Sequence, residues 1–233
     1  MPTTLEVLGQ AGIQVQAAAD LLHFRIPGGQ QYQPRDYTVN GDYPSAAAVL
    51  AAGAITDSHI AVERLLSDSQ GERAVVPLLA RMGVVVQHRG DTVELRGHRG
   101  LRAVEFDGDT ATDMVLAMLA VAALAEGESR FHGIGNLRLK ECDRIAMPVR
   151  ELGRVGVECR EGASEIWVRG RPEGYEGGIE VQTWHDHRMV QMLSLVGLRC
   201  RLGLVVQDAE NVGKSYPGFF ADLVRLGARI ELE

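Results

Sequence analysis

The segment from Asn136 to Arg144 carries three cationic and two acidic side chains within nine residues. Lys140 and Arg144 are four residues apart, so a helix that begins near Glu141 would place both on one face, where they could bind the same anion. Glu141 could donate or accept a proton there if its surroundings shift its pKa towards the working pH. These residue types suggest a site for an anionic substrate. The simpler interpretation is a solvated helix start, in which Glu141 and Asp143 favour the positive end of the helix.

Two later segments have related chemistry, the first running from Trp184 to Met189 and the second from Val212 to Pro217. In the first, two histidines flank an aspartate at a spacing of two residues. Histidines at that spacing point apart on a helix, and no third ligand is close in sequence, so a metal site is not indicated. Asp186 is better explained as a helix cap than as a catalytic group. Lys214, in the second segment, is by itself typical of a surface charge.

In order and spacing, these segments resemble the 5-enolpyruvylshikimate-3-phosphate synthase family. The nonapeptide matches the pattern N-x-R-x-K-E-x-D-R, Asp186 to Met189 match D-H-R-M, and Lys214 to Phe220 match K-S-x-P-x-F-F. The resemblance covers the whole chain, which looks like only the second half of such an enzyme. It implies transfer of the enolpyruvyl group of phosphoenolpyruvate to the 5-hydroxyl of shikimate 3-phosphate, with neither a metal nor an organic cofactor.

The resemblance also implies a role for each matching side chain. Residues expected to bind substrate are Asn136, Lys140, Arg144, Arg188 and Lys214. The first two would contact shikimate 3-phosphate, and the other three would bind phosphoenolpyruvate, for which the planar fork of arginine suits carboxylate or phosphate. Residues expected to be catalytic are Asp113, Glu141 and His187.

By the same resemblance, Asp113 is the expected base for the 5-hydroxyl, Glu141 is a proton-transfer group, and His187 lies near the reacting groups. The family often has proline before that aspartate, whereas this chain has Thr112. As a bare sequence feature, Asp113 would be only a helix cap. Its role therefore depends on the resemblance.

The elements that must position these residues recur about every seventy residues. Four apolar helical stretches each lead through a glycine into a β-rich run, and the glycines are Gly12, Gly83, Gly156 and Gly227, separated by 71, 73 and 71 residues. Glycine suits a helix C-terminus because the left-handed turn costs least without a Cβ atom. The regular spacing indicates an internal repeat.

Three other helical stretches begin after Asp42, Asp113 and Asp186, at intervals of 71 and 73 residues. These stretches are apolar or small nearly all round, so we expect them to be buried. Their expected ranges are residues 45–54, 114–125 and 189–198. With β-rich runs between and after the helices, each unit has the order βαβαββ. We predict an inside-out α/β domain with pseudo-threefold symmetry, in which sheets surround buried helices.

The strand candidates include residues 13–15, 36–39 and 228–230. The repeat divides the chain into residues 1–39, the end of a preceding unit, and residues 40–233, a nearly complete domain. We therefore expect a complementary N-terminal half as a partner, whether as a separate chain or as the rest of a longer one. This chain alone is expected to be inactive or nearly so.

Composition excludes several classes of protein. The chain of 233 residues is 45% hydrophobic and 24% charged, as expected for a soluble globular protein. Its net charge of −7 argues against nucleic-acid binding. The longest apolar run is too short to span a membrane, and the N-terminus does not resemble a signal peptide, so we expect a cytoplasmic protein with no membrane partner. Three widely spaced cysteines predict reduced thiols, with Cys142 packed rather than nucleophilic.

Two alternative functions remain open. The sister enolpyruvyl transferase that acts on UDP-N-acetylglucosamine shares the fold but is expected to lack the K-E-x-D-R pattern. A non-catalytic anion-binding or interaction module is the other alternative. Such a module would not need the carboxylates of Asp113 and Glu141.

Overall fold

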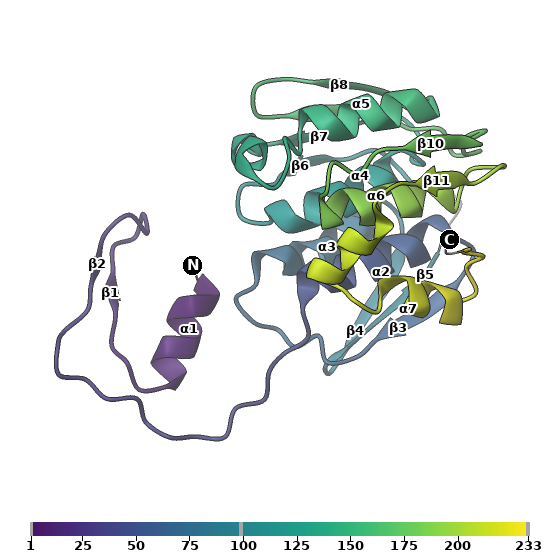
Figure 1. The fold of residues 1–233 in the computed structure, drawn as a ribbon. Coiled ribbons are helices and arrows are strands. Elements are labelled where there is room, and N and C mark those ends of the chain that lie inside the picture. The colour runs from purple at the N-terminus through teal and green to yellow at the C-terminus, as the bar shows by residue number, and fades with distance from the viewer. Residues whose placement is uncertain (1, 98–99, 232–233) are drawn as a thin grey trace.

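Three helices lie at the centre of the computed structural model, which describes residues 2–97 and 100–231 (Figure 1). They are α2 (Tyr43–Ile55), α4 (Val115–Ala122) and α6 (His187–Gly197). The three pack against one another, and every residue of α4 is buried. Helices without a polar face need apolar neighbours on all sides, which explains their central position. The three predicted buried helices are confirmed.

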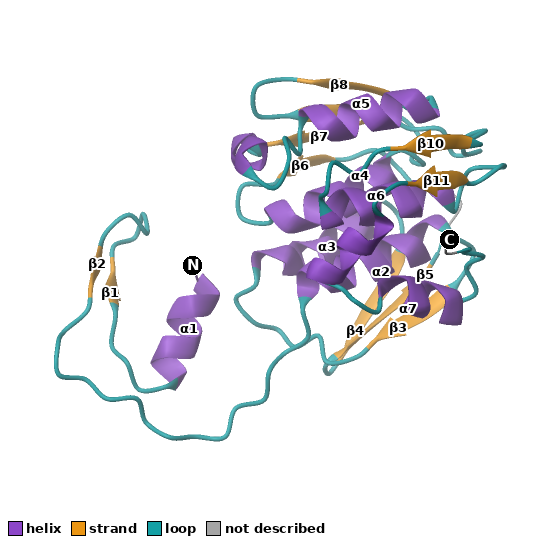
Figure 2. Cartoon of the chain, in the orientation of Figure 1, coloured by secondary structure: helices purple, strands orange, loops and turns teal. Residues whose placement is uncertain are grey.

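The strands lie outside these helices (Figure 2). The first sheet has the order β3-β5-β4, with β3 (His59–Val62), β4 (Val85–Arg89) and β5 (Thr92–Arg96). The second has the order β6-β7-β9-β8, with β6 (Glu105–Asp107), β7 (Glu128–His132), β8 (Glu158–Glu161) and β9 (Ile166–Arg169). In the third, β10 (Ile179–Val181) runs parallel to β11 (Leu204–Val206). Sheets on the outside and helices within confirm the inside-out α/β architecture.

In each unit a second helix follows the strand that comes after the buried helix, namely α3 (Val75–Arg81), α5 (Ala146–Val155) and α7 (Phe219–Arg225). Short 3-10 helices connect the elements, namely η1 (Gly71–Ala74), η2 (Thr112–Met114), η3 (Gly135–Leu139) and η4 (Ala209–Lys214). The middle unit runs β6-α4-β7-α5-β8-β9, which is the predicted βαβαββ order in full.

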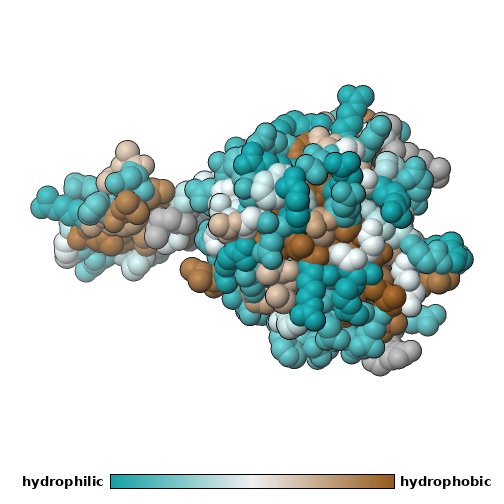
Figure 3. Space-filling model, turned by 90° about the horizontal axis from the view of Figure 1, so that it is seen from above, coloured by the Kyte–Doolittle hydropathy of each residue, from teal (hydrophilic) through white to brown (hydrophobic). Residues whose placement is uncertain are grey.

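The N-terminal arm, residues 2–39, consists of α1 (Pro2–Gln10) and the two-residue strands β1 (Gln16–Ala17) and β2 (Phe24–Arg25). No residue of α1 is buried, and Figure 3 shows apolar side chains on the surface of the arm. A link to the rest of the chain is Glu6, whose carboxylate accepts a hydrogen bond of 3.2 Å from the backbone N–H of Ser69. The arm has little core of its own.

Three strand predictions were wrong, because residues 13–15, 36–39 and 228–230 form no strand. Strand formation depends on a neighbouring strand that can complete the hydrogen-bond ladder, so a β-rich run alone is weak evidence. The residues that pair near the first of these runs are Gln16 and Ala17, opposite Arg25 and Phe24.

The four repeat glycines all have left-handed backbone, with φ of 80° at Gly12, 93° at Gly83, 100° at Gly156 and 99° at Gly227. Gly156 ends α5, where its N–H is bonded to the carbonyl of Gly153 at 3.1 Å. The predicted helix ends are therefore confirmed, and the reason is the predicted one: a residue without a Cβ adopts this turn at least cost.

Alanine at Gly156 is expected to lower the free energy of unfolding by about 1–2 kcal/mol, since a left-handed L-residue is strained by roughly that amount. A Cβ there would meet only Tyr175, at 3.9 Å, so the cost comes from the backbone and not from a clash. The matched control is Gly153→Ala inside the same helix, which should raise the free energy of unfolding by about 0.5–1 kcal/mol. Urea unfolding of both variants measures this, and shifts in the same direction would contradict it.

Candidate active site

Arg144 lies at the centre of a cluster of charged side chains and is only 2% exposed. Its guanidinium donates to both oxygens of Asp186, at 2.7 Å from Nε and 3.1 Å from Nη2. It also donates to Asp113 at 3.1 Å and to Glu141 at 2.8 Å. Because Asp113 precedes α4 and Asp186 precedes α6, this one side chain joins two units of the repeat.

Two lysines extend this arrangement. Lys214, at the end of η4, donates to Oε1 of Glu141, and Nζ of Lys140 lies 3.5 Å from Oδ1 of Asp113. Nδ1 of His187 lies 4.0 Å from Oε1 of Glu141. We call this set the charged cluster; its members are Asp113, Lys140, Glu141, Arg144, Asp186, His187 and Lys214. Residues up to 101 positions apart in sequence thus meet at one place.

The helix that follows the nonapeptide begins beyond its last residue, Arg144. The start near Glu141 that a shared face would require is not observed, because α5 begins at Ala146. Asp143 determines this start, since its Oδ1 accepts hydrogen bonds of 3.0 Å from the N–H groups of Ile145 and Ala146. Lys140 and Arg144 therefore do not lie on one helical face. Both lie in the turn before α5, and from there each contacts carboxylates of the charged cluster.

Arg138 and Asp143 have a structural role within the same motif. Arg138 donates to Asp143 and to Glu161, both at 2.7 Å, and so ties the turn to the end of β8. The nonapeptide thus contains both residues that shape the loop and residues that face the charged cluster.

The two repeat aspartates at this site differ in function. Asp186 caps α6, as predicted, with Oδ1 accepting from the N–H of Arg188 at 2.8 Å. Its second role, as the main partner of Arg144, was missed, because nothing in sequence links positions 42 residues apart. Asp113 is not a cap: it lies inside η2, and its own N–H donates to Glu72 at 3.3 Å. Glu72 carried no signal in the sequence.

Arg188 and His187 are buried, and each has a side-chain nitrogen that makes no hydrogen bond within the described residues. Nη1 of Arg188 donates to the carbonyl of Pro44 at 3.0 Å and to Gln191 at 3.1 Å. Within the described residues, Nε of Arg188 and Nδ1 of His187 are buried without a hydrogen-bond partner. Arg188 therefore lies towards the start of α2, beside the charged cluster and not in a salt bridge with it.

Asn136 is exposed on η3, and among the described residues no hydrogen bond joins it to the charged cluster. Seven of the eight predicted site residues thus belong to the charged cluster or lie beside it, and Asn136 is the one without such a contact among the described residues. In residues 2–97 and 100–231, no group of His, Cys, Asp and Glu side chains could hold a metal ion, and no helix is long and apolar enough to cross a membrane.

The surroundings set the protonation of this centre. Partial burial favours the neutral form of Glu141, but the hydrogen bond from Lys214 and the charges of Arg144 and Lys214 prevail and lower its pKa to about 2. Burial lowers the pKa of Arg144, yet its bonds to Asp186 outweigh this and the pKa is raised overall. Burial and the charge of Arg188 lower the pKa of His187. The neutral imidazole is therefore favoured beside an ionised Glu141.

Cys142 is a poor nucleophile in this environment. Burial, followed by the charge of Asp186, raises the pKa of its thiol to about 12. The reactive species of cysteine is the thiolate, which is scarce at neutral pH with such a pKa. The packing interpretation of Cys142 agrees with this environment.

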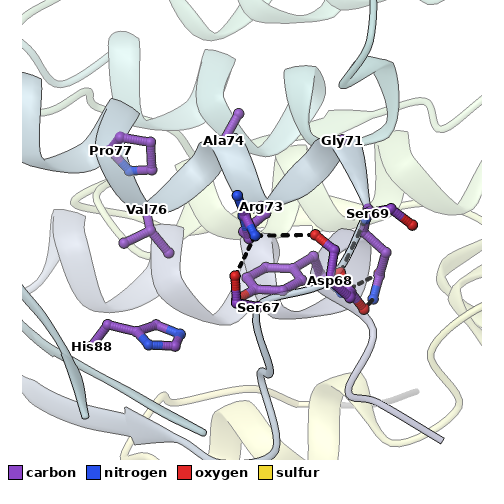
Figure 4. Close-up of a pocket in the computed structure, with 11 residues that line it drawn as sticks. Ser67, Asp68, Ser69, Gly71, Arg73, Ala74, Val76, Pro77 and His88 are labelled. Atoms are coloured by element: carbon purple, nitrogen blue, oxygen red, sulfur yellow. Dashed lines mark hydrogen bonds between the residues drawn. The ribbon is translucent and has the colours of Figure 1, made fainter. Parts of the chain in front are cut away.

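A cavity of about 560 Å³ lies beside the start of α2 and α3 (Figure 4), and no residue of the charged cluster lines it. Arg73 lies between its polar and apolar sides and donates to the carbonyl of Asp68 at 3.1 Å. None of the predicted site residues lines this cavity. The charged cluster itself, with Lys140, Glu141 and Lys214 all exposed, lies at the surface of the domain.

The fold is that of enolpyruvyl transferases. The structure matches EPSP synthase from Acinetobacter baumannii with a TM-score of 0.85 and 26% identity, over 98% of this chain and 55% of that one. It matches the enolpyruvyl transferase NikO from Streptomyces tendae with a TM-score of 0.76 and 22% identity, over 97% of this chain and 53% of that one, a likeness of fold alone.

Within this class, the chain belongs to the EPSP synthase family. The profile of the family described as EPSP synthase (3-phosphoshikimate 1-carboxyvinyltransferase) matches residues 1–223. The 3-phosphoshikimate 1-carboxyvinyltransferase of Deinococcus radiodurans is 44% identical over 98% of this chain and 52% of its own length. That of Aeropyrum pernix is 39% identical over 98% of this chain and 52% of its own. The chain thus spans about half the length of the curated relatives it matches.

Proposed function

We propose that this chain forms one wall of the active site of a 3-phosphoshikimate 1-carboxyvinyltransferase. The reaction would transfer the enolpyruvyl group of phosphoenolpyruvate to the 5-hydroxyl of shikimate 3-phosphate and release phosphate. The observation that carries this proposal is the charged cluster, in which cations and carboxylates from two repeat units meet at one surface. The family of the chain supports the same reaction.

The cations would neutralise the charges of phosphoenolpyruvate. Arg144, Arg188 and Lys214 are the proposed ligands for its carboxylate and phosphate, and charge stabilisation of this kind often contributes more to catalysis than any other effect. The buried N–H of Arg188 without a partner supports the proposal, because such a donor gains free energy from an anionic acceptor. Lys140 and Asn136 are the proposed contacts to shikimate 3-phosphate.

The carboxylates would move protons. Asp113 would remove the proton of the 5-hydroxyl while the oxygen of that hydroxyl forms a bond to C2 of phosphoenolpyruvate. Glu141 would give a proton to C3 of phosphoenolpyruvate. Loss of a proton from C3 with departure of phosphate would then restore the double bond. His187 is the proposed third catalytic group, and its distance of 4.0 Å from Glu141 supports a role in the same proton transfers.

The other wall would come from a complementary N-terminal half. The relatives are about twice as long as the matched region, and the charged cluster lies at an open surface. Residues 1–39 are the proposed end of the preceding repeat unit and residues 40–233 the C-terminal domain. The exposed apolar side chains of the N-terminal arm, such as Leu22, Ile26 and Val39, support burial of the arm in that half.

Reconstitution tests this function. The chain would be mixed with the part of the Deinococcus radiodurans relative that precedes the matched region, and phosphate release from both substrates would be measured. We expect turnover by the pair and almost none by either part alone. Strong turnover by the isolated chain would contradict the proposed second wall. A pair that binds both substrates without releasing phosphate would favour the non-catalytic module, and calorimetric binding of UDP-N-acetylglucosamine in preference to shikimate 3-phosphate would favour the sister transferase.

A further inference from the structure

The three buried helices differ in how they begin. In the first and third repeat units, which contain α2 and α6, the repeat aspartate caps its own helix. Asp42 accepts a hydrogen bond of 2.9 Å from the N–H of Ser45, and Asp186 accepts one of 2.8 Å from the N–H of Arg188. A capping side chain satisfies N–H groups that the start of a helix leaves without a partner in the backbone. Part of each of these carboxylates is therefore occupied by its own helix.

The second unit, which contains α4, has no such cap of its own. Its helical backbone starts with η2, which leads directly into α4, and the residue before η2 is Ala111, whose side chain has no acceptor. Asp113 is the second residue of this helical segment, just as Arg188 is the second residue of α6. The N–H at this position is one of those that a capping side chain satisfies. An acceptor for it has to come from another part of the chain.

The acceptor comes from the first unit. Oε1 of Glu72, in η1, accepts a hydrogen bond of 3.3 Å from the N–H of Asp113, although the two residues are 41 positions apart in sequence. The carboxylate of Asp113 is left to face Nη1 of Arg144 at 3.1 Å and Nζ of Lys140 at 3.5 Å. Asp113 thus differs from the other two repeat aspartates because Glu72 takes over the capping role.

The loop that carries Glu72 is fixed on both sides. The side chain of Gln70 accepts a hydrogen bond of 2.9 Å from the backbone N–H of Tyr43, the first residue of α2. On the other side, Gly71 packs so closely against the second unit that a Cβ there would overlap with the carbonyl oxygen of Thr110. The carboxylate that reaches the second unit is therefore carried by a backbone that its neighbours hold in place.

The surroundings of Glu72 favour a role for its hydrogen bond over a role for its charge. Burial raises the pKa of Glu72, and hydrogen bonds from two backbone N–H groups, including that of Asp113, oppose this effect. The negative charge of Asp113 and the positive charge of Arg188 act on the same pKa in opposite directions. Because these two charges oppose each other, the hydrogen bond to the backbone of Asp113 is the contact that distinguishes Glu72.

We propose that Glu72 is a positioning residue for Asp113. Glu72 caps the helix of the second unit from the first unit and holds the backbone of Asp113, which leaves the Asp113 carboxylate to face the substrate hydroxyl. A displacement of about 1 Å at a catalytic group can lower a rate about 10²-fold, so a fixed backbone at this residue has a direct effect on turnover. The role of Asp113 as the base rests on the proposed function, whereas the cap itself does not.

Amide hydrogen exchange of the isolated chain tests the cap. In Glu72→Ala, the N–H of Asp113 should exchange about tenfold faster, because it loses its acceptor. Glu72→Gln should keep most of the protection, since glutamine retains an oxygen that accepts a hydrogen bond. The control is Glu63→Ala, which removes another glutamate of the first unit, one with an exposed side chain, and should leave this exchange unchanged.

Steady-state phosphate release by the reconstituted pair tests the positioning role. Glu72→Ala should lower kcat about 10- to 100-fold with little change in KM, and Glu72→Gln should retain most of kcat. Because Glu72 acts through Asp113, the double variant E72A/D113N should have the same kcat as D113N to within about twofold.

Three results would overturn the proposal. Unchanged exchange at Asp113 in E72A would show that Glu72 does not cap the helix. Equal losses of kcat in E72Q and E72A would assign the effect to the charge of Glu72 and not to its hydrogen bond. A full further loss of kcat when E72A is added to D113N would show that Glu72 acts elsewhere.

Failure of the proposed function has a different signature. It would appear as no turnover by the pair, or as normal kcat in D113N, while exchange at Asp113 still responds to E72A. In that case the cap stands, and the catalytic role of Glu72 is overturned together with that of Asp113.

Discussion

Replacing Asp186 with asparagine is expected to lower the free energy of unfolding by about 3–5 kcal/mol, the range typical when one partner of a buried ion pair is removed. Asp186 is fully buried and supplies two of the hydrogen bonds of Arg144, which is itself buried. Asparagine has nearly the same volume and can still cap α6. The loss would therefore come from the uncompensated charge of Arg144 and not from a cavity or a lost cap.

Urea unfolding of the isolated chain measures this effect. Glu176→Gln is the control, because Glu176 also binds an arginine, Arg201, but both side chains are exposed, and an exposed ion pair contributes little to stability. The double variant R144M/D186N should be less destabilised than the sum of its single variants, since removing Arg144 removes the unpaired charge. A change for D186N as small as that for E176Q would show that Asp186 does not compensate a buried charge.

The architecture could be predicted because its signals are local. A run such as residues 114–125 has no polar face, so it must be buried wherever it lies, and four glycines at nearly equal spacing each follow the end of a helix for the same steric reason. The strands at residues 36–39 and 228–230 were predicted from local signals too, and those predictions failed. A strand needs a neighbour, and local sequence does not contain the neighbour.

The charged cluster could be predicted only in part. Its residue types came from the resemblance, but Arg144 precedes α5 and Asp186 precedes α6, so their pairing depends on how two units of the repeat pack, which is a property of the whole domain. Sequence did not show which of two acidic residues serves the helix start: Asp143 accepts from the first N–H groups of α5, which leaves Glu141 free to bind Lys214. Spacing alone does not separate a capping carboxylate from one that faces a substrate.

In the reconstituted pair, Glu141→Gln and Asp113→Asn are each expected to lower kcat by about 10² to 10⁴, the usual contribution of a proton-transfer group. Glu141 is ionised in the free chain, because Lys214 and Arg144 hold its pKa at about 2. To protonate C3 it must first gain a proton. Binding of an anion to Lys214 and Arg144 would neutralise the charges that lower this pKa, so the substrate itself would raise it towards neutrality. Glutamine cannot take part in that cycle.

The matched control for these variants is Asp143→Asn, which lies two residues from Glu141 in the same motif but caps α5 and binds Arg138. Asparagine also caps helices well, so kcat should change little while stability falls slightly. Steady-state phosphate release gives kcat and KM separately, and a proton-transfer role predicts losses mainly in kcat. Since glutamine in place of Glu141 keeps the shape of the side chain and an oxygen that accepts from Arg144, a large rise in KM with unchanged kcat would instead assign Glu141 to substrate positioning. Equal losses of kcat for E141Q, D113N and D143N would mean that these carboxylates act by maintaining the fold of the site and not by transferring protons.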